Sequence, residues 1–252
     1  LMRNHSAVGT REQEYYRFVD QLPAIREMIR LRYALLPYLY SEFMKAALEN
    51  SSYFRPLAFD YPEDPDAREV QDQLLLGEGL MCAPVYTQNA HGRHVYLPES
   101  MKLLRLRSAE DYDEEILPAG HHYLRCGLDE ILLFLRPGRL VPVAKPAANT
   151  AALDDTALTL WHYLPEGGHA AYRMYTDDGV TTDYDRPDHW RTLTPCSGVL
   201  PGKPFSKPQN TPGAPSFPLC LRRGRFLFQN KRFMPAGPTA SWAGAPDPAG
   251  RA

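Results

Sequence analysis

Apolar side chains recur at three- and four-residue intervals between residues 25 and 47, a spacing that places them on one face of an α-helix. The positions on this stripe are Ile25, Met28, Ile29, Leu35, Leu36, Leu39, Phe43 and Ala47. Pro23 suits the first turn of such a helix, whereas Pro37 lies inside it and is predicted to kink or divide it. On or beside the solvated face we expect Arg26, Glu27, Arg30, Glu42 and Lys45.

The segment after this helix is predicted to continue an α/β pattern. Residues 53–59 are short, rich in aromatic side chains and bounded by turn residues, which predicts a buried strand whose pairing Pro56 restricts. Residues 69–76 can form a short helix that stops at Gly77. A long helix that alternates with a strand in this way is typical of an α/β barrel repeat.

After Gly79 the pattern changes to short apolar runs separated by turn residues, which is typical of an antiparallel β-sandwich. The runs cover residues 80–86, 94–97, 102–106, 130–135, 140–143 and 157–163. Pro142, Pro146 and Asn149 mark an expected hinge between two such modules. Farther along, residues 172–175 and 181–184 are predicted to form a hairpin whose turn contains Gly179.

Residues 195–252 follow neither a strand nor a helix period. They hold 11 of the 24 prolines, and 8 Lys and Arg against the single acid Asp247, whereas residues 1–194 hold 20 Lys and Arg against 29 Asp and Glu. A charge split this sharp suggests two pieces of different origin or role. The last segment is therefore either a disordered basic tail or a frame-shifted or misassembled stretch.

Composition narrows the class of protein without adding a site. Hydrophobic residues make up 44% of the chain and charged residues 23%, which is ordinary for a globular protein. The four cysteines, Cys82, Cys126, Cys196 and Cys220, show neither a metal-binding spacing nor a disulfide framework. No apolar run reaches the ~20 residues that a membrane helix needs. The chain opens without an initiator methionine, so it gives no information about a signal peptide.

A series of short motifs, in one order, gives the first functional signal. They are Arg3-Asn4-His5-Ser6, the segment 32–40, Arg55-Pro56-Leu57, Pro62-Glu63-Asp64, the segment 72–77, and the segment 80–85 ending in Ala83-Pro84-Val85. Val95-Tyr96-Leu97-Pro98, the segment 134–138 and the segment 175–179 follow. Together these residues resemble glycoside hydrolase family 31, the α-glucosidase family, over roughly residues 1–194.

The resemblance implies an α/β plus all-β fold in which the chain is a C-terminal fragment. Residues 1–78 would be the C-terminal portion of a (β/α)8 TIM barrel, residues 79–147 a proximal β-sandwich and residues 148–194 the start of a distal one. Residues 195–252 would be the Pro-rich basic tail or frame-shifted stretch. One departure is the segment 99–103, which stands where members of the family often carry a Trp-Tyr-Asp turn.

Retaining glycosidases use two carboxylates, a nucleophile and a general acid/base. In family 31 both are aspartates that precede the Arg-Asn-His motif, so the resemblance implies that they lie upstream of Leu1, and we assign no catalytic residue here. The acids Asp60, Glu63, Asp64 and Asp72 match a structural loop of the family instead.

Substrate-binding roles remain for two residues, Arg3 and His5. The resemblance implies that His5 hydrogen-bonds hydroxyls of the sugar in the cleaved subsite and that Arg3 supports the pocket electrostatically. A neutral imidazole offers one donor and one acceptor to neighbouring hydroxyls. From local sequence alone, the alternative is a solvated loop histidine.

Other candidate sites are weaker. The pairs His91 and His94, and His121 and His122, lack further metal ligands, so we expect a polar loop and a turn and predict neither a metal nor a cofactor. The segment 177–179 is predicted to be a turn, and Arg55 a structural ion-pair partner. A basic and aromatic cluster in residues 222–232 is too isolated to predict nucleic-acid binding.

The sequence thus predicts part of a retaining α-glucosidase-like hydrolase that cleaves terminal α-linked glucosyl residues from oligosaccharides. The alternatives are a parent enzyme of α-xylosidase specificity, and a non-catalytic carbohydrate-binding or scaffold β-sandwich that uses Trp161, Trp190 or Trp242. The expected partner is an α-glucoside oligosaccharide, and neither nucleic acid nor a membrane. Oligomeric state and localisation stay open.

Overall fold

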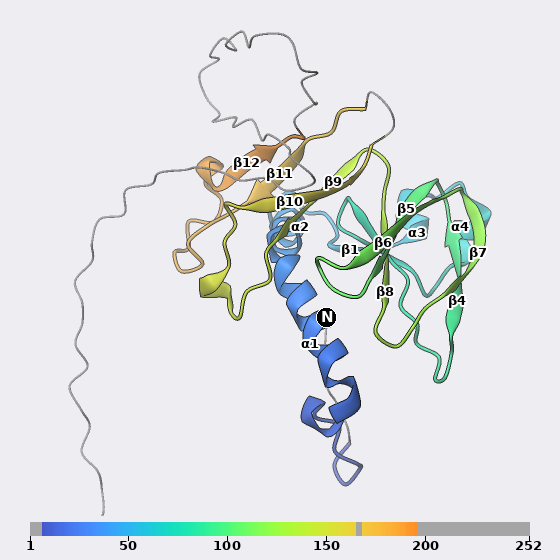
Figure 1. Ribbon diagram of the computed structural model, residues 1–252. Helices are drawn as coiled ribbons and strands as arrows, with labels where there is room; N and C mark the ends of the chain where they lie inside the picture. The colour runs from blue at the N-terminus through green and yellow to red at the C-terminus, as the bar shows by residue number, and fades with distance from the viewer. Residues whose placement is uncertain (1–6, 165–167, 196–252) are drawn as a thin grey trace, which may run out of the picture.

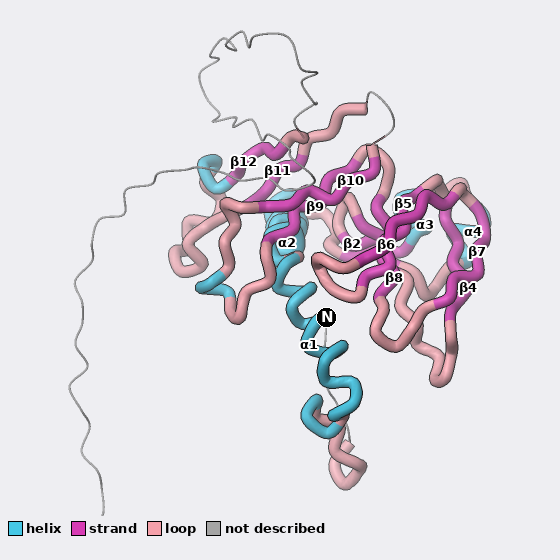
Figure 2. The backbone as a smooth tube through the Cα atoms, in the orientation of Figure 1, coloured by secondary structure: helices cyan, strands magenta, loops and turns pink. Residues whose placement is uncertain are grey.

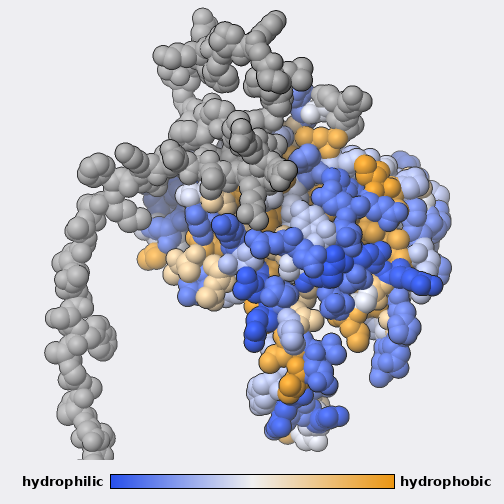
Figure 3. Space-filling view, in the orientation of Figure 1, coloured by the Kyte–Doolittle hydropathy of each residue, from blue (hydrophilic) through white to orange (hydrophobic). Residues whose placement is uncertain are grey.

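A computed structural model describes residues 7–164 and 168–195. The chain begins with two 3-10 turns, η1 (Tyr15–Arg17) and η2 (Val19–Gln21), and continues into helices α1 (Leu22–Ala34) and α2 (Leu36–Glu49). The segment before α1 projects from the rest of the molecule (Figure 1). Its apolar side chains Phe18 and Val19 are exposed, and Figure 3 shows apolar surface on this projecting part. Among the described residues, no helix is long and apolar enough to cross a membrane.

The predicted division of the N-terminal helix is confirmed. Helix α1 ends at Ala34, and Pro37 occupies the first turn of α2, where its missing amide proton leaves no hydrogen bond unmade. Helix α2 ends at Glu49, and the next residue, Asn50, has a φ of 53°, the left-handed conformation common at helix C-termini. The prediction that Glu42 lies on the solvated face is wrong. Glu42 is 5% exposed, because it has hydrogen-bond partners in other elements.

Two expectations for the next segment are also wrong. The strand β1 covers only Phe54–Pro56 and lies at the end of a sheet with its first and last residues exposed, and α3 (Leu57–Asp60) follows it. The expected helix over 69–76 is instead α4 (Pro65–Glu69), followed by the strand β2 (Leu74–Leu76). Asp64 caps α4 by accepting the amide protons of Asp66 and Ala67, so the helix begins and ends earlier than predicted.

After Gly79 the chain forms antiparallel strands, as expected, joined by loops and 3-10 turns. The strands are β3 (Leu80–Cys82), β4 (Gly92–Leu97), β5 (Met101–Leu106), β6 (Tyr112–Leu117), β7 (Gly120–Arg125), β8 (Ile131–Leu135), β9 (Arg139–Ala144), β10 (Leu158–Tyr163), β11 (Tyr172–Tyr175) and β12 (Trp190–Leu193). Short 3-10 turns, η3 (Thr150–Ala152) and η4 (Pro187–His189), lie between the later strands.

The strands form one six-stranded sheet and three two-stranded ribbons (Figure 2). The large sheet has the order β1-β2-β3-β8-β5-β6, and the ribbons pair β4 with β7, β9 with β10, and β11 with β12. The hairpin predicted between residues 172–175 and 181–184 is wrong, because β11 pairs with β12. The Asp178 carboxylate accepts the amide protons of Val180 and Thr181, which folds that segment into a turn.

Two apolar cores hold these layers together. One lies between the helices α1 and α2, the ribbons β9–β10 and β11–β12, and one side of the large sheet, and it includes Tyr38 and Trp161. The other lies between the large sheet and the β4–β7 ribbon, and it includes Val95, Leu124 and Phe134. The chain division proposed at residues 78 and 79 stays a prediction; β2 and β3, which flank it, pair within one sheet.

Candidate functional site

The two predicted substrate-binding residues, Arg3 and His5, lie outside the described residues. The same is true of Cys196, Cys220, Trp242 and the whole predicted tail apart from Pro195. The roles of Arg3 and His5 therefore stay predictions. The described part of the chain supplies the helices and sheets that follow them.

Asp60, Glu63, Asp64 and Asp72 are predicted to be structural. For three of them, Asp60, Asp64 and Asp72, the hydrogen-bond and ion-pair partners agree with a structural role. Asp60 accepts two hydrogen bonds from Arg55, at 2.7 and 3.1 Å, and one from Arg136 at 2.8 Å. Asp64 caps α4 and accepts the Tyr96 hydroxyl at 2.7 Å, and Asp72 pairs with Arg93 at 2.7 Å.

These contacts also keep the three carboxyl groups ionised. Burial on its own would raise the pKa of Asp60, but hydrogen bonds from the two arginines outweigh it and lower the pKa. The Tyr96 hydroxyl lowers the pKa of Asp64. At Asp72, partial burial on its own would raise the pKa, but hydrogen bonds from Tyr86 and Arg93 outweigh it and lower the pKa. A general acid needs a raised pKa, so none of the three has the character of a glycosidase acid.

Arg55 was predicted to be an ion-pair partner, and this is confirmed, but the size of its network was not foreseen. Arg136 also donates to Glu99 at 3.2 Å and to the Tyr61 hydroxyl at 3.0 Å, and Tyr61 in turn donates to Glu99. Glu99 is the first residue of the segment that departs from the family pattern. It ties the turn after β4 to the strand β8 and to the loop after α3.

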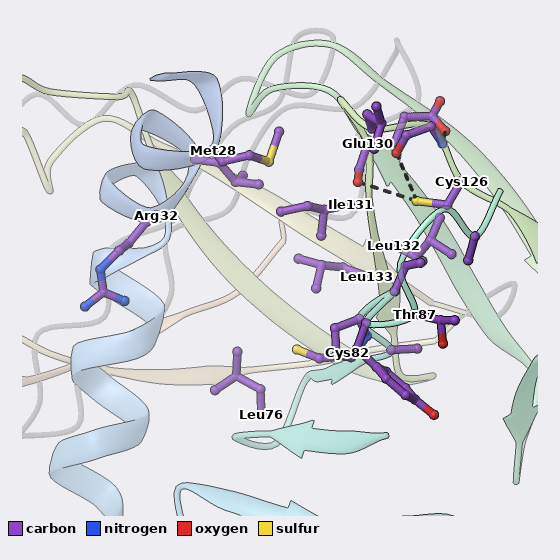
Figure 4. A pocket seen from close by; sticks show the side chains of 18 of the residues that line it. Met28, Arg32, Leu76, Cys82, Thr87, Cys126, Glu130, Ile131, Leu132 and Leu133 are labelled. Carbon is purple, nitrogen blue, oxygen red and sulfur yellow. Dashed lines mark hydrogen bonds between the residues drawn. The ribbon is translucent and has the colours of Figure 1, made fainter. Parts of the chain in front are cut away.

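A pocket of about 700 Å³ lies between α1 and the large sheet (Figure 4). Its walls are mostly apolar and include Met28, Leu76 and Ile131. Two thiols, Cys82 and Cys126, also line it. Burial raises the pKa of Cys82 to about 12 and raises that of Cys126, so neither is a thiolate nucleophile at neutral pH.

This pocket lacks the pair of carboxylates that glycoside hydrolysis requires. Its acidic lining residue, Glu130, accepts the amide proton of Gly127 at 2.8 Å. The described residues that line this pocket therefore do not supply the pair of catalytic carboxylates.

The histidine pairs do not form a metal site. Within residues 7–164 and 168–195, no group of three or more His, Cys, Asp or Glu side chains is placed to hold a metal ion. His121 and His122 were expected in a turn, but both lie in β7. The predicted turn over residues 177–179 is confirmed: Asp177 accepts the amide proton of Gly179 at 3.0 Å, and Gly179 has a φ of +67°.

Trp161 is buried, with 3% of its surface exposed, so it does not offer a sugar-stacking face. Trp190 is partly buried beneath the guanidinium of Arg173, which lies 4.5 Å from the ring centre. Among the described residues, tryptophan therefore gives little support to the alternative of a free-standing carbohydrate-binding module.

Comparison with known families identifies the chain. Residues 1–42 match the model of the glycosyl hydrolases family 31 TIM-barrel domain, and residues 50–141 match that of the glycosyl hydrolase family 31 C-terminal domain. The chain belongs to glycosyl hydrolase family 31. The two matches follow each other in the order expected from the motifs, with the boundary between them before β1.

Relatives in the family include proteins named as α-glucosidases. The chain is 31% identical to "Alpha-glucosidase 2" of Bacillus thermoamyloliquefaciens over 191 residues, which are 75% of this chain and 23% of that protein. It is 34% identical to lysosomal alpha-glucosidase of Bos taurus over 191 residues, 71% of this chain and 20% of that protein. The chain thus spans about a fifth of the length of the curated relatives it matches.

Solved structures of the family share the fold of the described residues. A glucosidase II alpha subunit superposes with a TM-score of 0.63 and 25% identity, over 74% of this chain and 20% of that one. The family 31 alpha-xylosidase of Xanthomonas citri superposes with a TM-score of 0.53 and 26% identity, over 71% of this chain and 18% of that one.

Proposed function

We propose that this chain is the C-terminal part of a retaining α-glucosidase-like hydrolase that removes terminal α-linked glucosyl residues from oligosaccharides. The observation that carries the proposal is the succession of two family 31 matches, barrel and then C-terminal domain, in a chain 31% and 34% identical to α-glucosidases. The barrel match matters because a carbohydrate-binding module alone would not contain barrel sequence.

In this proposal the nucleophile and the acid/base belong to sequence outside residues 1–252. Residues 1–78 complete the barrel, with Arg3 and His5 on a loop at the C-terminal end of a barrel strand, where substrate is bound in such folds. Residues 79–147 and 148–194 are the proximal and distal β-sandwich domains. Asp60 is ionised and accepts hydrogen bonds from Arg55 and Arg136. These contacts give its carboxylate a structural role, which supports the proposal that the catalytic carboxylates lie elsewhere.

The second candidate function is that of an α-xylosidase. The 26% identity to the Xanthomonas citri alpha-xylosidase supports this candidate. A glucoside differs from a xyloside by its hydroxymethyl group, and a pocket that binds that group discriminates strongly through its polar contacts. The two functions therefore predict opposite specificity ratios.

The test is to express the natural full-length protein and to measure kcat/KM with a chromogenic α-glucoside and the matching α-xyloside. We expect the α-glucoside to be preferred by at least about tenfold, which corresponds to about 1.4 kcal/mol of transition-state binding. A preference for the α-xyloside would replace the proposal with the second candidate. Hydrolysis of neither would reject both.

A further inference from the structure

The outward face of the β4–β7 ribbon carries a strip of four rings in two cross-strand pairs, whose ring planes are inclined by 63° and 44°. In this antiparallel pair His94 lies opposite Tyr123, and Tyr96 lies opposite His121. The ring centres are 5.0 Å apart in the first pair and 4.7 Å apart in the second. Because side chains alternate across a strand, the four rings share one face.

The inward face of the same ribbon is what holds the strip in place. Val95, Leu97 and Leu124 are buried in the core beneath the ribbon. Gln73 bonds the backbone of Tyr96 from the side, donating to its carbonyl at 2.7 Å and accepting its amide proton at 2.8 Å. The ribbon is therefore a rigid support rather than a mobile loop.

The rings themselves are also fixed at one end. The Tyr96 hydroxyl donates to Asp64 at 2.7 Å, and the Nε2 of His121 lies 3.3 Å from a carboxylate oxygen of Asp66. Tyr123 is 57% exposed, and the side chain of His121 is 67% exposed. Arg125 lies at the other end of the same face, opposite Gly92.

We propose that this strip, formed by His94, Tyr96, His121 and Tyr123, is an auxiliary binding surface for an α-glucan chain. The choice of an α-glucan as the ligand rests on the proposed function, whereas the strip itself is argued from the geometry of the β4–β7 ribbon. Aromatic faces stack on the apolar C–H faces of a sugar, while the imidazole nitrogens, the Tyr123 hydroxyl and the Asp66 carboxylate are placed to bond its hydroxyls.

The dimensions and the chemistry of the strip favour a sugar over a protein partner. Residues 92 and 96 are separated by about 14 Å along an antiparallel strand, which suits a short run of linked sugars. The outward positions, Gly92, His94, Tyr96, His121, Tyr123 and Arg125, include no aliphatic side chain. A protein interface of this size would need an apolar centre.

The test uses the whole 252-residue chain, with its affinity for soluble starch and for dextran measured by retardation in affinity gels and by calorimetry with maltotetraose. Tyr123→Thr removes the ring but keeps a β-branched residue in the strand. It is expected to weaken binding about tenfold, while Tyr123→Phe, which keeps the ring and loses only the hydroxyl, is expected to weaken it by less than about threefold. Tyr16→Ala is the matched control, because Tyr16 is 63% exposed but lies on η1.

Thermal unfolding of each variant separates binding from strand stability. Loss of affinity in Tyr123→Thr with an unchanged Tm supports the proposal, and loss in His121→Ala would extend it to the second pair. Absence of glucan binding by the unaltered chain overturns the proposal, and so does equal affinity in Tyr123→Thr. Because the assay measures binding without turnover, its failure leaves the proposed hydrolase function standing, and failure of that function leaves this result standing.

Discussion

Glu42 in helix α2 and Tyr172 in strand β11 are joined by a 2.7 Å hydrogen bond from the Tyr172 hydroxyl to Oε1 of Glu42. The same carboxylate accepts Lys45 at 2.7 Å and the amide proton of Glu78 at 2.9 Å. Lys45 also lies 4.0 Å from the centre of the Tyr172 ring and donates to Glu78. One buried carboxylate thus connects the helix to the loop after β2 and to the β11–β12 ribbon.

Removing this carboxylate should therefore destabilise the whole chain. Glu42→Ala removes the carboxylate that the Tyr172 hydroxyl and the Glu78 amide bond, and it leaves Lys45 with Glu78 alone. We expect a loss of about 3–5 kcal/mol. The measurement is the free energy of unfolding in urea. The same helix offers the control, because Glu49 pairs with Arg173, the neighbour of Tyr172, at an exposed position.

We expect Glu49→Ala to change the free energy of unfolding by less than about 1 kcal/mol, since exposed ion pairs contribute little. Equal effects of the two substitutions would show that burial of the Glu42 network is not what holds the helix to the sheets.

The Asp60 network predicts a dependence of stability on pH. Burial opposes ionisation of Asp60, but its hydrogen bonds from Arg55 and Arg136 lower its pKa in the folded chain. A lowered pKa means that the unfolded chain binds the proton more readily. The contribution of Asp60 is therefore complete above the ordinary aspartate pKa of about 3.9, and it is lost as the pH falls through the lower folded value.

The comparison that isolates this effect is between the unaltered chain and Asp60→Asn. Their difference in unfolding free energy should be constant from pH 7 to about pH 5 and should shrink below about pH 4. Asp20→Asn, at an exposed position in η2, is the control for the substitution itself. If the difference in unfolding free energy between the unaltered chain and Asp60→Asn stayed constant down to pH 2.5, a lowered pKa of Asp60 in the folded chain would be contradicted.

The N-terminal third of the chain should not be stable on its own. Tyr38 is fully buried, and its hydroxyl donates to the Leu76 carbonyl at 2.7 Å and accepts the Gly79 amide proton at 2.8 Å. The apolar face of α1 and α2 is covered largely by the strands β9 and β11. A polypeptide of residues 1–79 keeps both hydrogen bonds of Tyr38 but loses the strands that cover the helices, so it should bind an apolar dye and aggregate. A sharp, reversible thermal transition would show otherwise.

His5 is predicted to bind substrate in the intact enzyme, on the basis of the Arg3-Asn4-His5-Ser6 motif. His5→Ala should lower kcat/KM for an α-glucoside by about two orders of magnitude, because sugar hydroxyls lose a partner that strengthens in the transition state. Stability should change little. His91→Ala removes an exposed histidine ahead of β4 and should leave kcat/KM within about twofold. Rates for His5→Ala close to the unaltered enzyme would make it a simple loop residue.

Local pattern was sufficient for elements whose partners are close in sequence. The stripe from Ile25 to Ala47 predicted the helices, and Pro37 predicted their division. The strands β6 and β7 escaped prediction because their sequences, YDEEIL and GHHYLR, are polar and lack an apolar run. β6 pairs with β5, the strand directly before it, and β7 pairs with the more distant β4. Neither pairing can be read from the composition of the strand itself.

The site was predictable only where a motif carried it. Arg55 could be recognised as an ion-pair partner, but Asp60 and Arg136 are 76 residues apart, and Glu42 and Tyr172 are 130 apart. A single sequence gives no sign that these residues meet. Glu42 was accordingly placed on the solvated face, although its three partners make burial possible.

The central claim is that this chain contributes structure and substrate binding to a hydrolase whose two catalytic carboxylates lie outside it. The most direct measurement is the turnover of one chromogenic α-glucoside by the natural full-length protein and by the 252-residue chain, side by side at equal concentration. The account predicts turnover by the full-length protein and a rate at the buffer background for the chain alone. Turnover by the chain comparable to that of the full-length protein would contradict it.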